Sequence, residues 1–448
     1  MSLSQQPLSR MACAVVLACG IGSIAAAEDT PGPELAQGTA AKAPDAKAAG
    51  EAGTDPATPE GWHWDGLGLK KGKSRIELAG YIQEDLRHYD WTVKGDEDGT
   101  LQAPTDELRR LRVGLKGNLG KLTFEAVWDP RSSQAPDRIK DITLGYDFSK
   151  AVKLLSGHFK PAVSQEYLTS AGKTDFVDRS MLASNLNPDR DWGAELFGEP
   201  GRIEYFVGVF AGDGAANTQS AETSVALRFG VKPAKGLLVS GSFMQGNVTP
   251  DPRQGATEPS PKGAHGQTAT GYTFWNRAHV SGTRRRLGGD LTYSRGPFRL
   301  QAEYLQLDEE RKGQGSTGQD IPNVMGRGWN AQVSYVLTGE KKGSTVEPAH
   351  SLFKGGFGAV EILARVEGLK FDDTGDPSGF AGYGNRARNI APSGATSIVA
   401  GLNYWPSNFM KLQGNALWES YNDPLIAPVP GKTGKYFSLI ARIQFMVP

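Results

Sequence analysis

Cysteine is nearly absent from this sequence, since its 448 residues contain only Cys13 and Cys19. Both lie within residues 11–27, an apolar run that follows a basic residue and ends in an Ala-x-Ala site, as a cleaved secretory signal does. We predict cleavage after Ala27, so that residues 1–27 form a signal peptide and the mature chain has no cysteine. That composition excludes disulfides, zinc–cysteine sites and thiol catalysis.

Two other interpretations of this first segment stay open. It could be a transmembrane anchor, although it is short for spanning and rich in small residues. It could also be a lipoprotein signal processed at Cys19, although Leu17 occupies a position where such sites usually have a small residue. The following residues, 28–61, are mostly Ala, Pro, Gly, Asp, Lys and Thr and cannot bury a core. We interpret them as a flexible linker.

Long apolar runs are missing after the first segment. No stretch of about 18 apolar residues follows Ala27, which excludes a helical membrane protein. Lys plus Arg and Asp plus Glu number 49 each, so the charge does not suggest a nucleic-acid binder. The mean hydropathy of −0.40 is that of many soluble proteins, but it is compatible with a membrane barrel, because only alternate strand residues must be apolar there.

Catalytic and metal-binding motifs are missing as well. The six histidines show no HExxH or clustered spacing, and no G-x-S-x-G sequence occurs. Gly172-Lys173-Thr174 resembles the end of a phosphate-binding P-loop, but Tyr167 stands where that motif has its first glycine. We predict no metal, no cofactor and no enzyme. A barrel enzyme with a Ser–His or Asp–His pair at one rim is the alternative that stays open.

The sequence is rich in period-two alternation from Trp62 to the C-terminus, which is typical of strands. The stretch ELRRLRVGLKG, residues 107–117, divides into an apolar set and a cationic set: Leu111, Val113 and Leu115 against Arg110, Arg112 and Lys116. An arginine facing lipid at the bilayer midplane costs ~2–4 kcal/mol. The apolar set must therefore face the membrane and the cations must line water.

Sixteen candidate strands lie between residues 74 and 446. Their connections alternate between short and long: short near 118–120, 149–150, 199–201, 233 and 295–297, and long over 91–106, 161–190, 247–283, 309–325 and 373–395. The exception is 339–355, which is long on the short side. This alternation is typical of an up-and-down barrel with one decorated rim. We predict an all-β fold, a sixteen-stranded antiparallel transmembrane β-barrel over residues 62–448. A soluble sandwich is less favoured, because it does not need charged residues on the polar face of nearly every strand.

Five stretches carry a resemblance to a known family: GHFKPAVSQEYLTSAGKTDFVDRS (157–180), GTRRRLGGDLTYSRGPFRLQAEY (282–304), SYVLTGE (334–340), GGFGAVEILARVEGL (355–369) and GLNYWPSN (401–408). In this order they resemble the phosphate-selective porin O and P family, over the chain from about Trp62 onward. SYVLTGE followed by GAVEILAR and then GLNYWP is specific in combination, although none of the three is specific alone.

The resemblance implies a homotrimer of barrels in the outer membrane of a Gram-negative bacterium. Each barrel would pass small anions, phosphate or polyphosphate first, through a channel narrowed by its third loop. The implied partners are these anions and the outer-membrane lipid, and no nucleic acid. Family members are described as having an inward ladder of arginines and a lysine in the constriction.

Strand parity selects the residues that could form such a ladder: Arg110, Arg112, Arg284 and Arg286, with Lys160 and Arg228 and, further, Arg75, Arg87, Lys116 and Arg299. The third loop, 161–190, adds Lys173, Arg179 and Arg190, and Lys173 is our candidate for the constriction lysine. A guanidinium offers several donors to phosphate oxygens and stays charged at any relevant pH. We therefore expect successive anion sites along the lumen.

Acidic residues on the same polar faces could neutralise much of this ladder: Glu77, Asp85, Glu125, Asp141, Asp290, Glu303, Glu361 and Glu367. Each arginine could therefore stiffen the lumen rather than contact a solute. For this reason a general or organic-anion diffusion porin of the same fold stays open, and so does a non-conducting surface barrel. A last irregularity is the C-terminus, where three residues follow Phe445 and could either weaken assembly or hang free in the periplasm.

Overall fold

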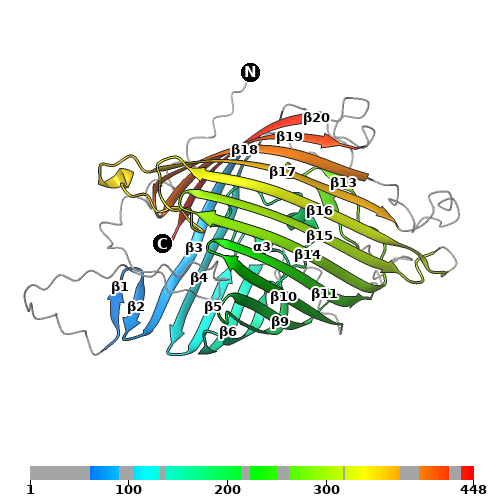
Figure 1. Cartoon of the computed structure of the whole chain (residues 1–448), viewed down its shortest axis with the longest axis horizontal. Coiled ribbons are helices and arrows are strands. Elements are labelled where there is room, and N and C mark those ends of the chain that lie inside the picture. The colour runs from blue at the N-terminus through cyan, green and yellow to red at the C-terminus, as the bar shows by residue number, and fades with distance from the viewer. Residues whose placement is uncertain are drawn as a thin grey trace, which may run out of the picture.

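The computed structural model describes residues 61–89, 105–131, 138–212, 222–249, 262–315, 318–373, 393–422 and 435–447. Sixteen strands form a closed antiparallel barrel, which confirms the predicted fold class (Figure 1). The barrel closes where the last strand, β20, pairs with the first barrel strand, β3, from Ser438↔Tyr89 to Met446↔Tyr81. The predicted signal peptide and nearly all of the predicted linker lie outside the described residues.

The sixteen barrel strands follow one another around the wall, with one exception in the numbering because β12 and β13 belong to a loop. They are β3 (Ser74–Tyr89), β4 (Thr105–Leu119), β5 (Leu122–Trp128), β6 (Ile139–Ser149), β7 (Val152–Phe159), β8 (Asp191–Gly198), β9 (Ile203–Ala211), β10 (Thr223–Ala234), β11 (Leu237–Val248), β14 (Gly282–Arg295), β15 (Phe298–Arg311), β16 (Ile321–Val336), β17 (Ala359–Asp373), β18 (Ser393–Ser407), β19 (Met410–Tyr421) and β20 (Lys435–Met446). A small hairpin of β1 (His63–Asp65) and β2 (Gly68–Lys71) pairs with the start of β3.

The two faces of each strand are those that alternation predicts. On β4, Val113 and Leu115 are 50% and 46% exposed on the outer wall, whereas the side chain of Arg112 is only 13% exposed. Leu144 on β6 and Phe229 on β10 face outward in the same way. An apolar outer wall around a polar interior is the arrangement that a lipid bilayer requires.

The two rims differ as the connection lengths predict. Tight turns join the strands at one rim, for example at Gly120, Gly201 and Gly296, each of which has a positive φ that favours glycine. We call this the turn rim and the opposite one the loop rim. The connection between β16 and β17, residues 337–358, is the long exception at the turn rim, and it contains the 3₁₀ helix η1 (Leu352–Lys354).

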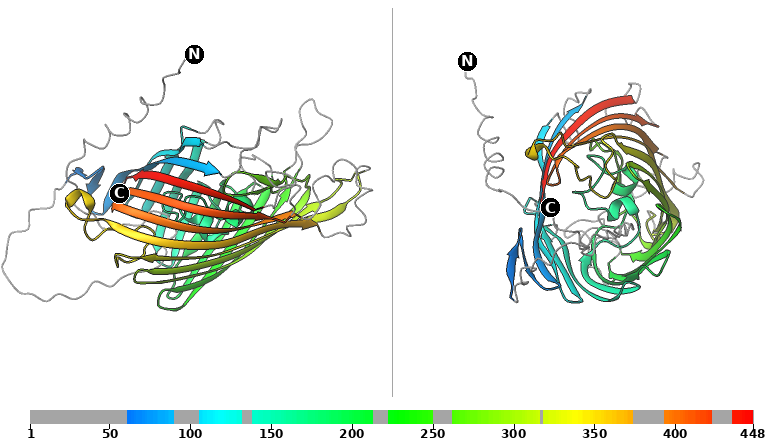
Figure 2. Two further views of the ribbon diagram at one scale, coloured as in Figure 1. Left: turned by 90° about the horizontal axis from the view of Figure 1, so that it is seen from above. Right: turned by 60° about the vertical axis from the view of Figure 1, so that its left-hand side comes forward.

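Two loops enter the lumen from the loop rim. Loop 3, residues 160–190, carries α3 (Gln165–Leu168) and α4 (Met181–Asn185), which lie inside the ring of strands (Figure 2, right). Loop 5, between β11 and β14, carries the hairpin of β12 (Gly266–Gln267) and β13 (Thr273–Trp275). None of the helices in the described ranges is long and apolar enough to cross a membrane.

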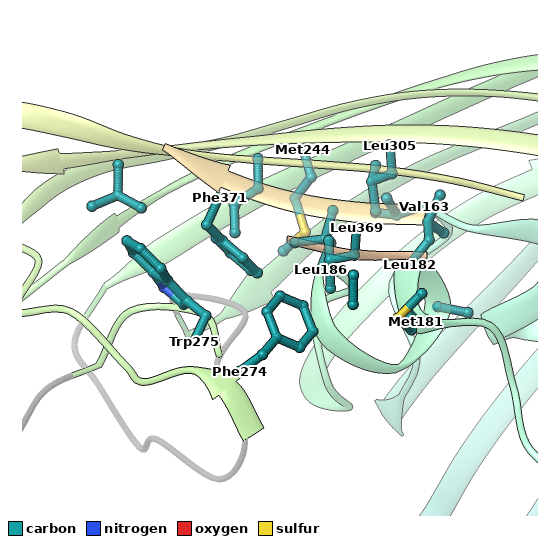
Figure 3. Packing of buried hydrophobic residues seen from close by; sticks show 14 of the residues in the cluster. Val163, Met181, Leu182, Leu186, Met244, Phe274, Trp275, Leu305, Leu369 and Phe371 are labelled. Carbon is teal, nitrogen blue, oxygen red and sulfur yellow. The ribbon is translucent and has the colours of Figure 1, made fainter. Parts of the chain in front are cut away.

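A hydrophobic cluster joins these loops to the wall. Leu182 of α4 and Leu186, the residue after this helix, pack with Phe371 of β17 and with Phe274 and Trp275 of loop 5 (Figure 3). The helix approaches closely because β16 has Gly328 there, where an added Cβ would lie 2.9 Å from Leu182 Cβ. Trp275 stacks on Phe371 with ring centroids 5.2 Å apart. The loops are thus packed parts of the core of the barrel.

The residues after Phe445 are ordered parts of the barrel as far as the structure describes them. The backbone N–H of Met446 donates to Phe409 O at 2.9 Å, and that of Val447 donates to Gly80 O at 2.9 Å. Met446 also packs against a buried cluster that includes Trp405. The alternative that this end hangs free is therefore wrong for Met446 and Val447.

Candidate functional site

Loop 3 owes its local shape to serine caps and to one glutamate. The hydroxyl of Ser164 accepts from Tyr167 N at the start of α3, and that of Ser180 accepts from Ala183 N at the start of α4. Such caps satisfy amide groups that a short helix leaves unpaired. Glu166 accepts from the backbone N–H of Ser180 at 3.0 Å and so ties the two helices together.

Loop 3 is held by one half of the wall, which runs from β14 to β20 and includes β3. Side chains of this half donate hydrogen bonds to backbone carbonyl groups of loop 3. Lys411 Nζ donates to Thr174 O at 2.7 Å. Arg442 Nη1 donates to Val177 O at 2.5 Å and Arg365 Nη1 donates to Asp178 O at 3.0 Å. Through these bonds the three cations tie loop 3 to the wall. We call this half the fastening wall.

Two of the predicted arginines, Arg284 of β14 and Arg228 of β10, lie in buried ion pairs. Arg228 makes two bonds to Asp290, of 2.6 and 2.8 Å, and donates to Val163 O of loop 3. Arg284 pairs with Glu309 at 2.7 Å. All four of these paired side chains are at most 3% exposed. Such pairs are kept because a single buried charge left alone is costly.

Arg284 and Arg286 also hold the two inward loops. Arg284 Nη2 donates to Lys262 O of loop 5 at 2.6 Å, and Arg286 Nε donates to Leu186 O of loop 3 at 2.7 Å. Both side chains are buried. The geometry favours the stiffening role that the sequence left open for these two arginines and for Arg228.

A second group of cations faces loop 3 from β4 and β6 and continues onto loop 3 itself. We call it the basic strip, and it consists of Arg110, Arg112, Lys140, Lys160, Arg179 and Arg190. In the described ranges, only Arg112 and Arg190 of these six lie within 4 Å of a carboxylate, Asp129 and Asp141 respectively. Five of the six were predicted from the sequence. The structure therefore brings five predicted cations into one region, and three of them, Arg110, Lys160 and Arg179, have no carboxylate within 4 Å in the described ranges.

Tyrosine rings hold the strip in place. Lys160 Nζ lies 4.8 Å from the centre of the Tyr167 ring, and the guanidinium of Arg179 lies 5.4 Å from the same ring. Across from them, the guanidinium of Arg112 lies 5.5 Å from the Tyr81 ring. Lys160 also donates to Tyr167 O at 2.6 Å, and Arg179 donates to Glu166 O and Thr169 O, so ring faces and loop carbonyls together fix these two cations.

The cations of the strip act on one another. Burial lowers the pKa of Lys160 well below its usual value, and the neighbouring charges of Arg179, Arg190 and Arg112 lower that pKa further, while Asp141 opposes them. Arg110 donates to Gln83 Oε1 at 3.0 Å rather than to a carboxylate. A group of cations that repel one another is stabilised by any anion that enters among them.

The amino-acid sequence matches the model of a known protein family. The family model described as phosphate-selective porin O and P matches residues 76–446, most of the chain. The chain belongs to this family. The resemblance found in the sequence is thereby confirmed, and the family is one of porins rather than enzymes.

Solved structures resemble the porin in fold. Outer-membrane expressed OmpT of Vibrio cholerae has a TM-score of 0.53 and 11% sequence identity, over 85% of this chain and 99% of that chain. The loop L8 deletion mutant of the same protein has a TM-score of 0.52 and 11% identity, over 84% and 100%. No curated protein sequence matches the chain. These likenesses support the outer-membrane barrel fold.

Lys173, the predicted constriction lysine, shares a cavity with Glu166 and Thr169, whose backbone oxygens accept from Arg179 of the strip. It lines this small cavity of the porin together with Asp175, Arg299, Gln301 and Ser344, the last of which belongs to the turn-rim connection 337–358. This cavity contains both acids and bases. Whether Lys173 contacts a solute there stays a prediction.

Two cations of the porin escaped sequence reasoning because of β-bulges. Arg109 is the extra residue where the β3–β4 register shifts, and it lies 3.9 Å from Asp178 of loop 3. Lys140 is the extra residue where the β5–β6 register shifts, and it interacts electrostatically with Arg112 and Arg190. A bulge redirects a side chain that parity would assign to the outer wall. No motif in the sequence announces either one.

In the described part of the porin, no cluster of three or more His, Cys, Asp or Glu side chains could hold a metal ion.

Proposed function

We propose that this porin passively conducts small anions, phosphate and its relatives first, along the basic strip between loop 3 and the wall of β4 to β6. The observation that supports this most is the unequal pairing of lumen cations. Arg228 and Arg284 are bound to buried carboxylates, whereas Arg110, Lys160 and Arg179 have none within 4 Å in the described ranges.

The chemistry of the strip suits a phosphate-like solute. Its guanidinium groups offer planar donor pairs to oxyanions, and its lysines add compact charges. Successive cations on β4, β6 and loop 3 provide several moderate sites in place of one deep site. Several moderate sites let an ion enter and also leave, which conduction requires.

The test is a planar lipid bilayer containing the purified porin. With a KCl gradient across the bilayer, we expect a reversal potential that indicates preference for chloride over potassium. Phosphate added to the chloride solution should reduce the chloride current at low concentration. A preference for potassium would contradict the anion proposal, and an unchanged chloride current would contradict the phosphate class.

A general or organic-anion diffusion porin of the same fold is the second candidate. Asp129 and Asp141 favour it, because they lie 3.6 Å from Arg112 and 2.9 Å from Arg190 and reduce the net charge of the strip. It would show anion preference without block by phosphate, and a dicarboxylate would carry current as well as phosphate does. A third candidate, a non-conducting surface barrel, would show no conductance at all.

We further propose that the porin forms a homotrimer in the outer membrane. The predicted signal peptide would direct its export. The low wall of β5 to β9 supports the trimer, since β5 has 7 residues and β9 has 9, against 16 in β16 (Figure 1). Its outer face is apolar, with Trp128, Trp192 and Val209 about half exposed. Light scattering of the detergent complex should give three copies, and a single copy would contradict the proposal.

A further inference from the structure

The long turn-rim connection between β16 and β17 reaches into the barrel with one side chain. Lys342 leaves the turn and ends fully buried, with Nζ 2.6 Å from Asp175 Oδ1 and 2.6 Å from Glu361 Oε1. Asp175 belongs to loop 3, which enters from the opposite rim, and Glu361 belongs to β17. A single ammonium group therefore joins a turn, a wall strand and the inward loop.

The surroundings show that this junction is a built network. Asn403 Nδ2 donates both to Asp175 O and to Glu361 Oε2, each at 2.9 Å. Arg299 lies 3.7 Å from Asp175 and donates to the backbone oxygen of Gly343, next to Lys342. Charged and polar groups thus surround the ammonium, as a buried charge requires.

The turn that presents Lys342 is itself fixed in place. Val346 is fully buried in a cluster with Val336 and Trp405. Phe353 of η1 stacks on Phe409 with ring centroids 5.3 Å apart. The backbone N–H of Lys342 donates to Gly296 O of the neighbouring turn at 2.8 Å. The ammonium is therefore held at the end of a packed support rather than on a swinging loop.

We propose that Lys342 is a positioning residue that holds the tip of loop 3 from the turn rim and so keeps the channel at one width. This role rests on the proposed function in one respect, namely that loop 3 narrows the conducting path. Without the ammonium, Asp175 would keep only the longer contact to Arg299, and Glu361 would keep no ion pair within 4 Å among the described residues. Their repulsion would push residues 174–178 away from the wall, and the carbonyl contacts of that tip would loosen with it.

Single-channel recording tests the proposal with Lys342→Met, which keeps most of the side-chain length and removes the charge. We expect loss of the single stable conductance level, with frequent transitions among several levels. Lys342→Arg keeps the charge and should retain the stable level. The matched control is Lys341→Met, since Lys341 is exposed on the same turn and its loss should change nothing.

Asp175→Asn is the second variant, in case Lys342→Met does not assemble. It removes the loop 3 partner but leaves the pair of Lys342 with Glu361, so it should also show several levels, with fewer transitions than Lys342→Met. A single stable level in both variants, or in Asp175→Asn alone if the other fails to assemble, overturns the positioning role. Reversal potential is recorded separately. Cation preference in the unaltered porin would contradict the proposed function. The conductance levels of the variants would still test the positioning role of Lys342.

Discussion

The two sides of the lumen use arginine in opposite ways. On β10 and on the fastening wall, Arg228 and Arg284 are bound to carboxylates and to loop carbonyls at exposures of 3% or less. On the side of β4 and β6, Arg110, Lys160 and Arg179 have their charges within a common space and no carboxylate within 4 Å in the described ranges. Basic side chains therefore stiffen one side of the lumen, whereas on the other side their charges are not balanced by carboxylates.

The difference shows that a row of lumen cations is not by itself an ion path. A cation attracts a passing anion strongly only if its charge is not already balanced by a carboxylate. That balance depends on partners that come from distant parts of the chain, such as Asp290 for Arg228. Substitutions of basic residues on each side of the lumen test this difference.

The largest effect should follow from breaking a buried ion pair of the lumen. Arg228→Ala leaves Asp290 buried without its partner, and loss of one member of a buried pair costs about 3–5 kcal/mol. We expect the free energy of unfolding in detergent to fall by an amount of this order. Urea titration followed by tryptophan fluorescence measures it.

Arg202→Ala is the matched control, because Arg202 is an exposed arginine of the turn before β9. Its loss should leave the unfolding midpoint unchanged. If Arg228→Ala were as stable as this control, Arg228 would not be a structural residue and would return to the candidates for solute contact.

Reversal of charge in the basic strip should have the next largest effect. Reversing one charge ~7 Å from a passing anion changes its energy by about 1 kcal/mol in a water-like medium, so Arg110→Glu with Lys160→Glu amounts to about 2 kcal/mol. We expect the ratio of anion to cation permeability to fall more than about tenfold, since 1.4 kcal/mol is a factor of ten. Reversal potentials in a KCl gradient measure this ratio.

The same two reversals at exposed turn lysines, Lys150→Glu with Lys235→Glu, provide the control. They change the net charge of the porin equally but lie at the turn rim. An equal loss of anion preference in the control would mean that overall charge, and not the strip, sets selectivity.

Neutralising two fastening arginines should affect selectivity less. Arg284→Gln with Arg286→Gln removes the contacts to Glu309 and Leu186 O but leaves the strip intact. We expect the permeability ratio to change by less than the charge reversals do, while loops 3 and 5 become easier to digest with protease. A drop in anion affinity equal to that of the strip variant would restore these residues to the ladder.

The fold could be predicted from the sequence because its rules are local. Alternation of the kind seen at Leu111, Val113 and Leu115 depends on the two-residue period of a strand, and lipid penalises any other orientation. The lengths of the connections then predicted which of them lie at the turn rim and which at the loop rim, and the long connection at the turn rim was recognised as an exception. The insertion of Lys342 from that exception could not be predicted, because its partners Asp175 and Glu361 meet it only in the closed barrel.

The site was predictable only in part, for two physical reasons. Parity placed Arg112 and Arg228 in the lumen equally well, but the pairing that separates them comes from contacts between distant strands and loops. In addition, β-bulges at Arg109 and Lys140 break the two-residue alternation from which the inward-facing residues were predicted. Bulges and long-range pairs both require the register of the whole sheet, which the sequence of one strand does not contain.

The smallest expected effect is a pH dependence that belongs to the strip side alone. Because burial and neighbouring cations lower the pKa of Lys160, the ammonium is present at low pH and is lost as pH rises through that lowered value. One charge ~7 Å from a passing anion is worth about 0.6 kcal/mol in a water-like medium, so anion preference should fall by roughly threefold as pH rises. Lys160→Met should remove this dependence and hold the porin at its high-pH value, whereas Arg284→Gln should preserve it. If Lys160→Met kept the full pH dependence, the titrating group would lie elsewhere, and the strip would have to carry its charge through its arginines alone.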